Sequence, residues 1–241
     1  MGMQAIAITD HCPGVDNFFW LIANEPKKAN WKNLIKGPDI HYVKTFTNRY
    51  QPPEDIQAKL FKGLECNILQ EGASGTDVPD ILSADLDLII ASIHPLIHLF
   101  NSKDKSLVTE RVLMAMEDPI DVIGHPFRRG FNPDIEALVT MASEKGIALE
   151  LNNASLRLVK SESRLLIDML RLSKEKHCRI SLASDAHCTN ELGLDESIVP
   201  LLDETAFPEE LIVNRNFESA RAFVDERKKV RREMKPKSSL K

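Results

Sequence analysis

This 241-residue chain has no apolar run close to the roughly 18 residues that a membrane-spanning helix needs. It also lacks a basic segment followed by an apolar stretch near residue 1, and position 6 is not the Ser or Thr of a myristoylation signal. None of its 4 cysteines is spaced as Cys-x-x-Cys, which fits reduced thiols better than a disulfide framework. We therefore expect a cytoplasmic protein that does not insert into a membrane.

Several motifs of known chemistry are missing too. The sequence contains no Gly-x-Ser-x-Gly elbow, no glycine-rich phosphate loop, no internal repeat and no low-complexity linker. Its 43% apolar and 28% charged content is that of an ordinary globular protein, and the length suffices for a core without disulfides or a structural metal. We expect a single domain over residues 1–226, followed by a basic tail over residues 227–241.

The net charge of −5 is unevenly distributed along the chain. Residues 227–241 hold eight Lys or Arg and one Glu, a local charge of +7 that leaves −12 for the rest. An acidic body repels a polyanion, so nucleic acid is a less favoured partner outside this segment. We interpret the segment as a solvated helix end that runs into a disordered terminus, with an interaction tail as the alternative.

Short apolar runs alternate with helical patterns along the chain. The runs expected to form strands are residues 5–9, 61–65, 86–93, 120–124, 147–151 and 179–183. Their nearly continuous apolar character is typical of parallel strands covered on both faces. Helical stripes lie over residues 107–116, 132–146 and 165–172; the second begins with Asn132, Pro133 and Asp134, which we interpret as an N-cap with Pro133 in the first turn, and ends at Gly146. This order predicts an α/β fold, either an open sheet or a barrel.

A polar side chain stands at the end of each expected strand. In a parallel barrel these ends converge on one face, where active sites of that architecture lie. Imidazole and carboxylate groups without a compensating Lys or Arg suit Zn, Mn or Fe ions, and gathered carboxylates are costly unless cations neutralise them. The expected metal ligands are His11, Glu65, His94, His125, Asp185 and His187.

Other residues of these types carry weaker expectations. A lone His or Asp after a strand is more often a loop cap than a ligand, and His41, His98 and His177 have no placement that favours ligation. Cys12 and Cys188 each follow an expected ligand, and we interpret them as small core residues rather than ligands of a soft metal.

Three further residues on the same face are candidates for binding substrate. Arg128 and Arg129 follow the strand at 120–124, where an arginine could clamp a phosphate, although solvation at the surface is the alternative. Asn152 lies at the end of the strand at 147–151 and could position ligands or substrate.

The residues at the strand ends form strings that resemble a known family. The strings are AITDH (7–11), GLECN (63–67), DLIIASIH (87–94), VIGHP (122–126), LELNN (149–153) and SLASDAH (181–187). They resemble, in order and over nearly the entire chain, the successive motifs of the PHP (polymerase and histidinol phosphatase) family, and are closest to its YcdX-like bacterial phosphatases. The resemblance implies a distorted seven-stranded β/α, TIM-like barrel with two or three divalent metal ions that hydrolyses phosphate esters.

The resemblance also implies roles for individual residues. Glu65 would correspond to the bridging carboxylate, and His94 and His125 to ligands of one metal. Asp185 would be a ligand of another metal, and we expect Asp10 and Asp185 to be the catalytic carboxylates.

The sequence departs from the family pattern before residue 10. His11 and His187 would be ligands or near neighbours of a third metal, but the family's His-x-His motif should stand about thirty positions before AITDH, and only nine residues precede Asp10. We therefore expect the first strand and helix of the barrel to be absent. Three explanations for this absence are open: an upstream start, a partner chain that closes the gap, or a decayed relative.

The function that we expect is hydrolysis of a small phosphorylated substrate. Bound Zn, Mn or Fe ions would activate a water molecule for attack on a phosphomonoester. The alternatives are a nuclease-type phosphodiesterase that uses the basic tail and a non-catalytic barrel with a partial metal site.

Overall fold

The computed structural model describes residues 3–11, 58–78, 83–94, 100, 102–158 and 163–234. Its strands form one parallel sheet of 6 strands in the order β1-β2-β3-β4-β5-β6. They are β1 (Ala5–His11), β2 (Lys59–Asn67), β3 (Leu88–Ser92), β4 (Val122–Ile123), β5 (Ala148–Asn152) and β6 (Ile180–Ala183). All the strands expected from the sequence are confirmed, and each pairs with its neighbour in chain order.

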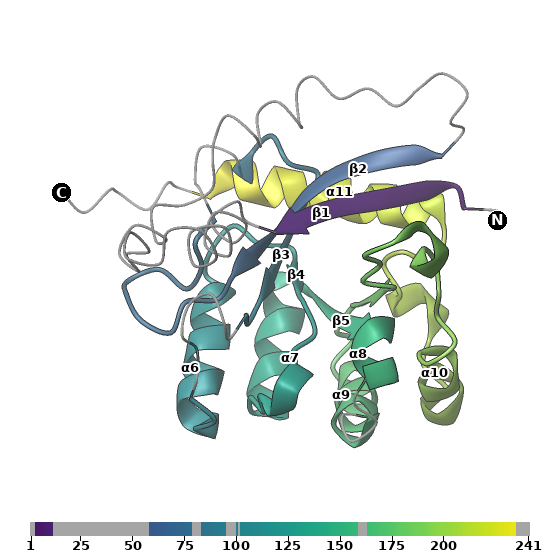
Figure 1. The fold of residues 1–241 in the computed structure, drawn as a ribbon. Helices are drawn as coiled ribbons and strands as arrows, with labels where there is room; N and C mark the ends of the chain where they lie inside the picture. Colours follow the sequence, from purple (N-terminus) through teal and green to yellow (C-terminus); the bar gives the residue numbers. More distant parts are fainter. Residues whose placement is uncertain are drawn as a thin grey trace, which may run out of the picture.

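The sheet curls into a half-barrel whose outer face is covered by all of the described helices except the last one (Figure 1). The helices are α6 (Lys105–Ala115), α7 (Ile135–Lys145), α8 (Asn153–Leu158), α9 (Ser163–Glu175), α10 (Val199–Thr205) and α11 (Phe217–Glu233). Short 3₁₀ turns are η1 (Arg128–Gly130), η3 (Thr189–Glu191) and η4 (Glu209–Leu211). A seventh strand is not among the described residues, so both the seven-stranded barrel and the expected absence of its first strand and helix stay predictions. Among the described residues, the helices lack the length and the apolar character that a membrane span requires.

Helix α7 shows how closely local signals set an element. Its N-cap is Asp134, whose carboxylate accepts a hydrogen bond from the backbone N–H of Ala137 at 3.0 Å. Gly146 ends the helix with a left-handed φ of 63°. Pro133 therefore precedes the cap and does not lie in the first turn, which corrects the sequence interpretation in one detail.

Alternation along the strands divides apolar from polar side chains. In β5, Leu149 and Leu151 belong to the main core with residues of the outer helices such as Leu138. Because successive side chains point to opposite faces, Glu150 and Asn152 lie on the inner face of the curled sheet. The carboxyl end of the inner face is thus polar and buried.

Helix α11 packs across the other side of the sheet from helices α6 to α10 (Figure 1). Phe223 of α11 packs with Val122 and Ala148 of the inner sheet face. Arg227 and Arg231 lie on successive turns of one face of α11. Each is 3% exposed, and both pair with the fully buried carboxylate of Asp121.

These contacts correct the expected domain boundary at residue 227. The helix continues to Glu233, and the first two arginines that the sequence assigned to the tail are buried instead. Arg227 also donates to the carbonyl oxygen of Ile120 at 2.8 Å, and Arg231 donates to that of Ser83 at 2.8 Å. Residues 235–241 lie outside the described residues.

Loss of the Arg231 charge should destabilise the fold. Arg231→Met leaves the Asp121 carboxylate buried with one of its two arginine partners missing, so the free energy of unfolding should fall by about 3–5 kcal/mol. Urea denaturation followed by circular dichroism measures the change. Arg232→Met, at the exposed neighbouring position, is the matched control and should change stability by less than about 0.5 kcal/mol. Equal losses in the two variants would contradict this account of the Asp121 pair.

Candidate metal centre

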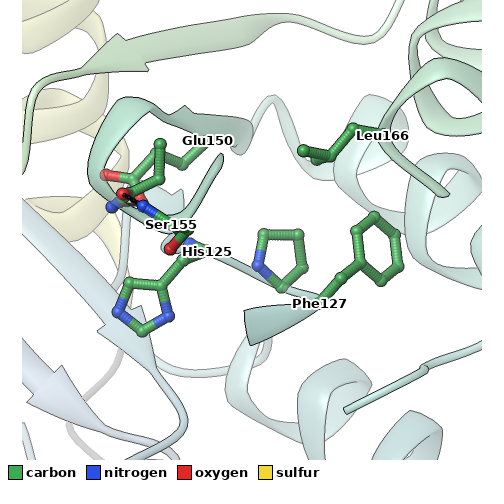
Figure 2. A pocket seen from close by; sticks show the side chains of 7 residues that line it. His125, Phe127, Glu150, Ser155 and Leu166 are labelled. Carbon is green, nitrogen blue, oxygen red and sulfur yellow. Dashed lines mark hydrogen bonds between the residues drawn. The ribbon is translucent and has the colours of Figure 1, made fainter. Parts of the chain in front are cut away.

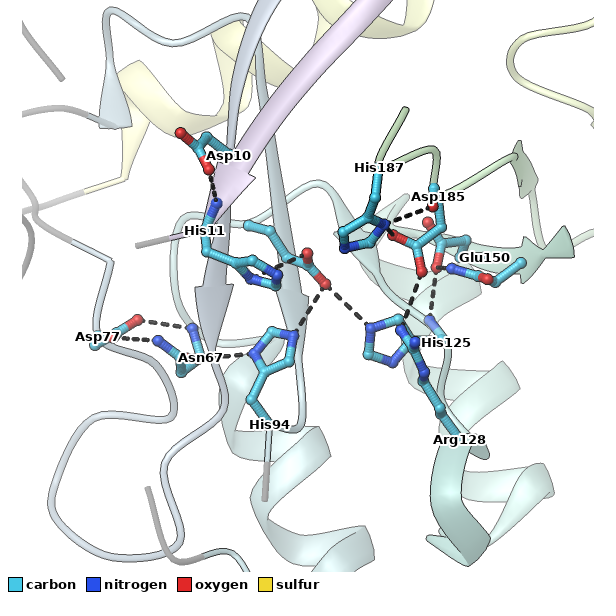
Figure 3. Close-up of polar contacts among 12 residues, drawn as sticks. Asp10, His11, Asn67, Asp77, His94, His125, Arg128, Glu150, Asp185 and His187 are labelled. Carbon is cyan, nitrogen blue, oxygen red and sulfur yellow. Dashed lines mark hydrogen bonds and ion pairs between the residues drawn. The ribbon is translucent and has the colours of Figure 1, made fainter. Parts of the chain in front are cut away.

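Three imidazoles from three neighbouring strand ends surround the carboxylate of Glu65 (Figure 3). His11 Nδ1 lies 3.4 Å from Glu65 Oε2, and His94 Nε2 lies 3.3 Å from Glu65 Oε1. His125 Nε2 lies 3.1 Å from the same Oε1. Parallel pairing brings the groups together: His11 is the register partner of Glu65, and His94 and His125 follow the next two strands.

The polar atoms of this cluster fit a divalent cation. His11 Nδ1, His94 Nε2 and His125 Nδ1 are buried and have no hydrogen-bond partner within the described residues. One ligand atom from each of His11, Glu65 and His94 can be chosen so that all lie within 4.8 Å of one another. Two imidazole nitrogens and a carboxylate oxygen are a donor set typical of zinc and similar ions.

Electrostatics favour a charged Glu65 and a neutral His94. Burial by itself raises the pKa of the Glu65 carboxyl, but its contacts with the imidazoles of His125 and His94 hold that pKa well below its usual value. Burial lowers the pKa of His94, although Glu65 opposes the change. For His125, burial also acts to lower the pKa, but the contacts with Glu65 and the charge of Glu150 raise it overall.

The backbone at His125 is held in an unusual conformation. His125 has a φ of 27°, and its N–H donates to Glu150 Oε2 at 2.7 Å. The preceding Gly124 is required because a Cβ atom there would lie 2.2 Å from Ser92 Oγ. Strained backbone of this kind costs about 1–3 kcal/mol and is concentrated at functional sites.

A small pocket of about 10 Å³ lies beside His125 (Figure 2). Phe127, Glu150, Ser155 and Leu166 contribute to its walls, and Ser155 Oγ is buried there without a hydrogen-bond partner in the described part of the chain. This volume suffices for about one water molecule, so a phosphorylated substrate would have to bind outside this pocket.

Asp185 and His187 lie at the same end of the sheet as the Glu65 cluster (Figure 3). Arg128 Nη1 donates to Asp185 Oδ2 at 3.0 Å, and His187 Nδ1 lies 3.0 Å from the carbonyl oxygen of Asp185. Asp185 has a left-handed φ of 51°, and the side chain of His187 is 68% exposed. The structure therefore brings three of the six expected ligands around a fourth, the Glu65 carboxylate, and leaves Asp185 and His187 in a separate group with Arg128.

Other expected site residues are placed differently. The exposed side chain of Asp10 accepts a hydrogen bond from the backbone of His11 at 2.8 Å and lies outside the Glu65 cluster. Asn152 Oδ1 accepts from the backbone N–H of Ser155 at 2.8 Å, which gives it a structural role at the start of α8. Arg129 is exposed, with a φ of 59°.

The expectations for the remaining His and Cys residues have mixed outcomes. Cys188 is exposed, so its interpretation as a core residue is wrong. His177 is exposed, and Cys12, His41 and His98 lie outside the described residues.

Sequence reasoning missed three residues that support the site. Glu150 is 5% exposed, and burial raises the pKa of its carboxyl even though the charge of His125 opposes the shift. A single charged residue inside an apolar strand is the signal that could have revealed it. Asn67 contacts His94 and is itself held by Asp77, and no local pattern marks Asp77 because it lies in a loop ten residues later.

Comparisons with known proteins give relatives of similar length. A probable phosphatase of Caldanaerobacter subterraneus subsp. tengcongensis is 30% identical over 232 residues, which cover 95% of this chain and 82% of the relative. A probable phosphatase of Acetivibrio thermocellus is 29% identical over 228 residues, covering 94% and 85%. One of Caldicellulosiruptor bescii is 30% identical over 230 residues, covering 92% and 83%. No protein-family model matches the chain.

Likenesses to solved structures are weaker. A chain of archaeal ribonuclease P with mature tRNA has a TM-score of 0.49 and 14% identity, covering 98% of this chain and 97% of the other. Histidinol phosphate phosphatase from Lactococcus lactis, complexed with zinc, L-histidinol and phosphate, has a TM-score of 0.46 and 15% identity, covering 86% and 84%. Neither likeness is close enough to decide the function of this chain.

The cluster should bind zinc through Glu65. Glu65→Gln removes the charge that faces all three imidazoles, so the affinity for Zn²⁺ should fall by at least about 100-fold. Competition with a chromophoric chelator measures the affinity in the metal-free chain. His177→Asn removes an exposed histidine at the opposite end of β6 and should leave the affinity unchanged. An unaltered affinity in Glu65→Gln would show that the ion is held elsewhere.

Proposed function

We propose that this chain, which belongs to the family of the bacterial probable phosphatases, is a metal-dependent phosphomonoester phosphatase of the PHP type. The observation that carries the proposal is the Glu65 carboxylate, with a side chain 12% exposed, among three imidazoles with ring nitrogens that have no hydrogen-bond partner in the described residues. This donor set lies at the carboxyl edge of the parallel sheet, the edge at which α/β proteins bind substrates.

Residues His11, Glu65, His94 and His125 would hold a divalent ion such as Zn, Mn or Fe. When bound, such an ion supplies Lewis-acid stabilisation of the phosphoryl oxygens and makes a water molecule more acidic. We assign Asp185 and His187 to a further ion of a site with two or three metals, because their imidazole and carboxylate groups lie at the same edge. Glu65 contributes an ionised carboxylate, since its pKa is held low by the two histidines.

Arg128 is the residue that we expect to bind the phosphoryl group. Its side chain is 24% exposed, and its guanidinium is held at this edge of the sheet by the hydrogen bond to Asp185. A planar guanidinium can donate two parallel hydrogen bonds to phosphate oxygens, which orients the substrate as well as neutralising its charge.

The structure favours a small substrate over nucleic acid. Two of the basic residues of 227–241, Arg227 and Arg231, are buried against Asp121, and Lys228 pairs with Asp87 at 2.8 Å. These three cations are engaged within the fold, which weakens the case for a polyanion-binding tail. A measurement of substrate turnover is what distinguishes the phosphatase from the alternative, a non-catalytic barrel.

Hydrolysis of p-nitrophenyl phosphate tests the proposal. The purified chain supplied with Zn²⁺, Mn²⁺ or Fe²⁺ should release p-nitrophenol, EDTA should abolish the reaction, and Glu65→Gln should lower kcat/KM by roughly 100-fold or more. His177→Asn should match the parent. Faster cleavage of bis(p-nitrophenyl) phosphate would favour the phosphodiesterase. Metal binding without turnover of any phosphoester in a broad panel would favour the non-catalytic barrel.

The two adjacent arginines should differ in their effect on substrate binding. Arg128→Lys loses the planar fork beside Asp185, and we expect KM to rise about tenfold, which corresponds to one lost charge-assisted hydrogen bond. Arg129→Lys, at the exposed neighbouring position, should change KM by less than about twofold. Steady-state kinetics on p-nitrophenyl phosphate compare the two. A larger effect at Arg129 would assign the phosphate clamp to that residue instead.

A further inference from the structure

A chain of three short hydrogen bonds connects Asp77 to His94 through Asn67 (Figure 3). The backbone N–H of Asn67 donates to Asp77 Oδ1 at 2.7 Å, and its side-chain Nδ2 donates to Asp77 Oδ2 at 2.7 Å. On the other side, His94 Nδ1 lies 2.7 Å from Asn67 Oδ1. Asn67 is 1% exposed, so these contacts are shielded from water.

The chemistry of the groups determines where the proton of His94 lies. An ionised carboxylate only accepts hydrogen bonds, so the amide nitrogen of Asn67 must face Asp77 and its oxygen must face His94. That oxygen also only accepts, so Nδ1 of His94 must carry the proton. In a neutral imidazole the lone pair is then on Nε2, which lies 3.3 Å from Glu65 Oε1. Two acceptors facing each other in a buried site favour a cation between them.

The loop that carries Asp77 is firmly attached to the rest of the fold. Arg111 of α6 donates to the carbonyl oxygens of Leu69 at 2.6 Å and Ser74 at 2.8 Å. Asp118 accepts from the backbone N–H of Thr76 at 2.7 Å and from its hydroxyl at 2.8 Å. The carboxylate of Asp77 is thus presented to Asn67 by a loop anchored at several points.

We propose that Asp77 and Asn67 are positioning residues that fix the tautomer of His94, so that its Nε2 is the atom available to a metal ion. The inference rests on the proposed metal-dependent function for its purpose and on the hydrogen-bond geometry for its content. Carboxylate or amide groups that orient a metal-binding imidazole typically change metal affinity by about 10- to 100-fold when they are removed.

Replacement of one carboxylate oxygen should reverse the tautomer. In Asp77→Asn, the new amide can keep its oxygen on the backbone N–H of Asn67 only if its NH₂ group faces the Asn67 side chain. Asn67 must then turn its own oxygen toward residue 77 and its NH₂ toward His94. Nδ1 of His94 becomes the acceptor, and the proton moves to Nε2, where it blocks metal binding.

Exchange of the two residues should restore the original state. In the double variant Asn67→Asp with Asp77→Asn, the amide at 77 accepts from the backbone N–H of residue 67 and donates to its carboxylate. That carboxylate still accepts from Nδ1 of His94, so every hydrogen bond of the chain is regained. Asn67→Asp alone places two carboxylates at a separation of 2.7 Å. Of the three variants it should have the lowest affinity for Zn²⁺.

The experiment measures the tautomer and the metal affinity of each variant. Two-bond ¹H–¹⁵N correlations of the full metal-free chain should show the Nδ1–H form of His94 in the parent and the double variant, and the Nε2–H form in Asp77→Asn. Zn²⁺ affinity, from chelator competition, should fall about 10- to 100-fold in Asp77→Asn and return to within about threefold of the parent in the double variant.

Asp87→Asn is the matched control. Asp87 also accepts from a backbone N–H of β2, that of Lys62 at 2.9 Å, but near the opposite end of the strand. This variant should keep both the Nδ1–H tautomer of His94 and the parent affinity for Zn²⁺. The control therefore distinguishes a loss of His94 orientation from a general loosening of β2.

Two results would overturn the proposal. One is an Asp77→Asn chain that keeps the Nδ1–H tautomer and the parent affinity for Zn²⁺; the other is a folded double variant that binds zinc as weakly as Asp77→Asn. Absence of phosphatase activity in the parent would instead refute the proposed function and leave the tautomer result standing.

Discussion

The structure depends on one constraint: the ends of neighbouring parallel strands meet at a single edge, where an ionised carboxylate is largely shielded from water. Glu65 is only partly reachable by water, and its charge is costly unless cations or hydrogen-bond donors surround it. In the fold, His125 Nε2 lies within hydrogen-bond distance of Glu65 at 3.1 Å, and the imidazoles of His11 and His94 from the adjoining strand ends contact the same carboxylate. The same groups that make the carboxylate tolerable also make a metal-ligand set, so stability and the proposed chemistry share one origin.

The inner and outer faces of the curled sheet serve different purposes. On the outer face, alternate side chains such as Leu149 and Leu151 join the core under the helices. On the inner face, Val122 and Ala148 pack against Phe223 of α11, and polar residues such as Glu150 stand at the carboxyl end. Packing from both sides leaves little freedom to β3, β4 and β5, and this rigidity supports precise placement of His94 and His125 after β3 and β4.

Buried charge is handled in the same way at two places in the molecule. Asp121 is surrounded by Arg227, Arg231 and backbone donors, and Asp118 is satisfied by the backbone and hydroxyl of Thr76. At the candidate metal centre, by contrast, some buried ring nitrogens have no hydrogen-bond partner among the described residues. The fold thus gives its structural carboxylates hydrogen-bond donors but leaves acceptors facing one another around Glu65. This arrangement is expected where a cation binds.

The amino-acid sequence by itself determined the strands, the main helices and the residue types at the strand ends. These features follow from local rules: apolar runs, a cap at Asp134, a stop at Gly146, and polar residues after each strand. Only the tertiary structure decided which of those residues meet. It grouped His11, His94 and His125 around Glu65, paired Asp185 with Arg128, and drew residues 227–233 into α11. It also brought Asp77 to Asn67 and Arg231 to Asp121, because contacts between distant residues depend on chain topology and on the burial of charge, and neither leaves a periodic mark in the sequence.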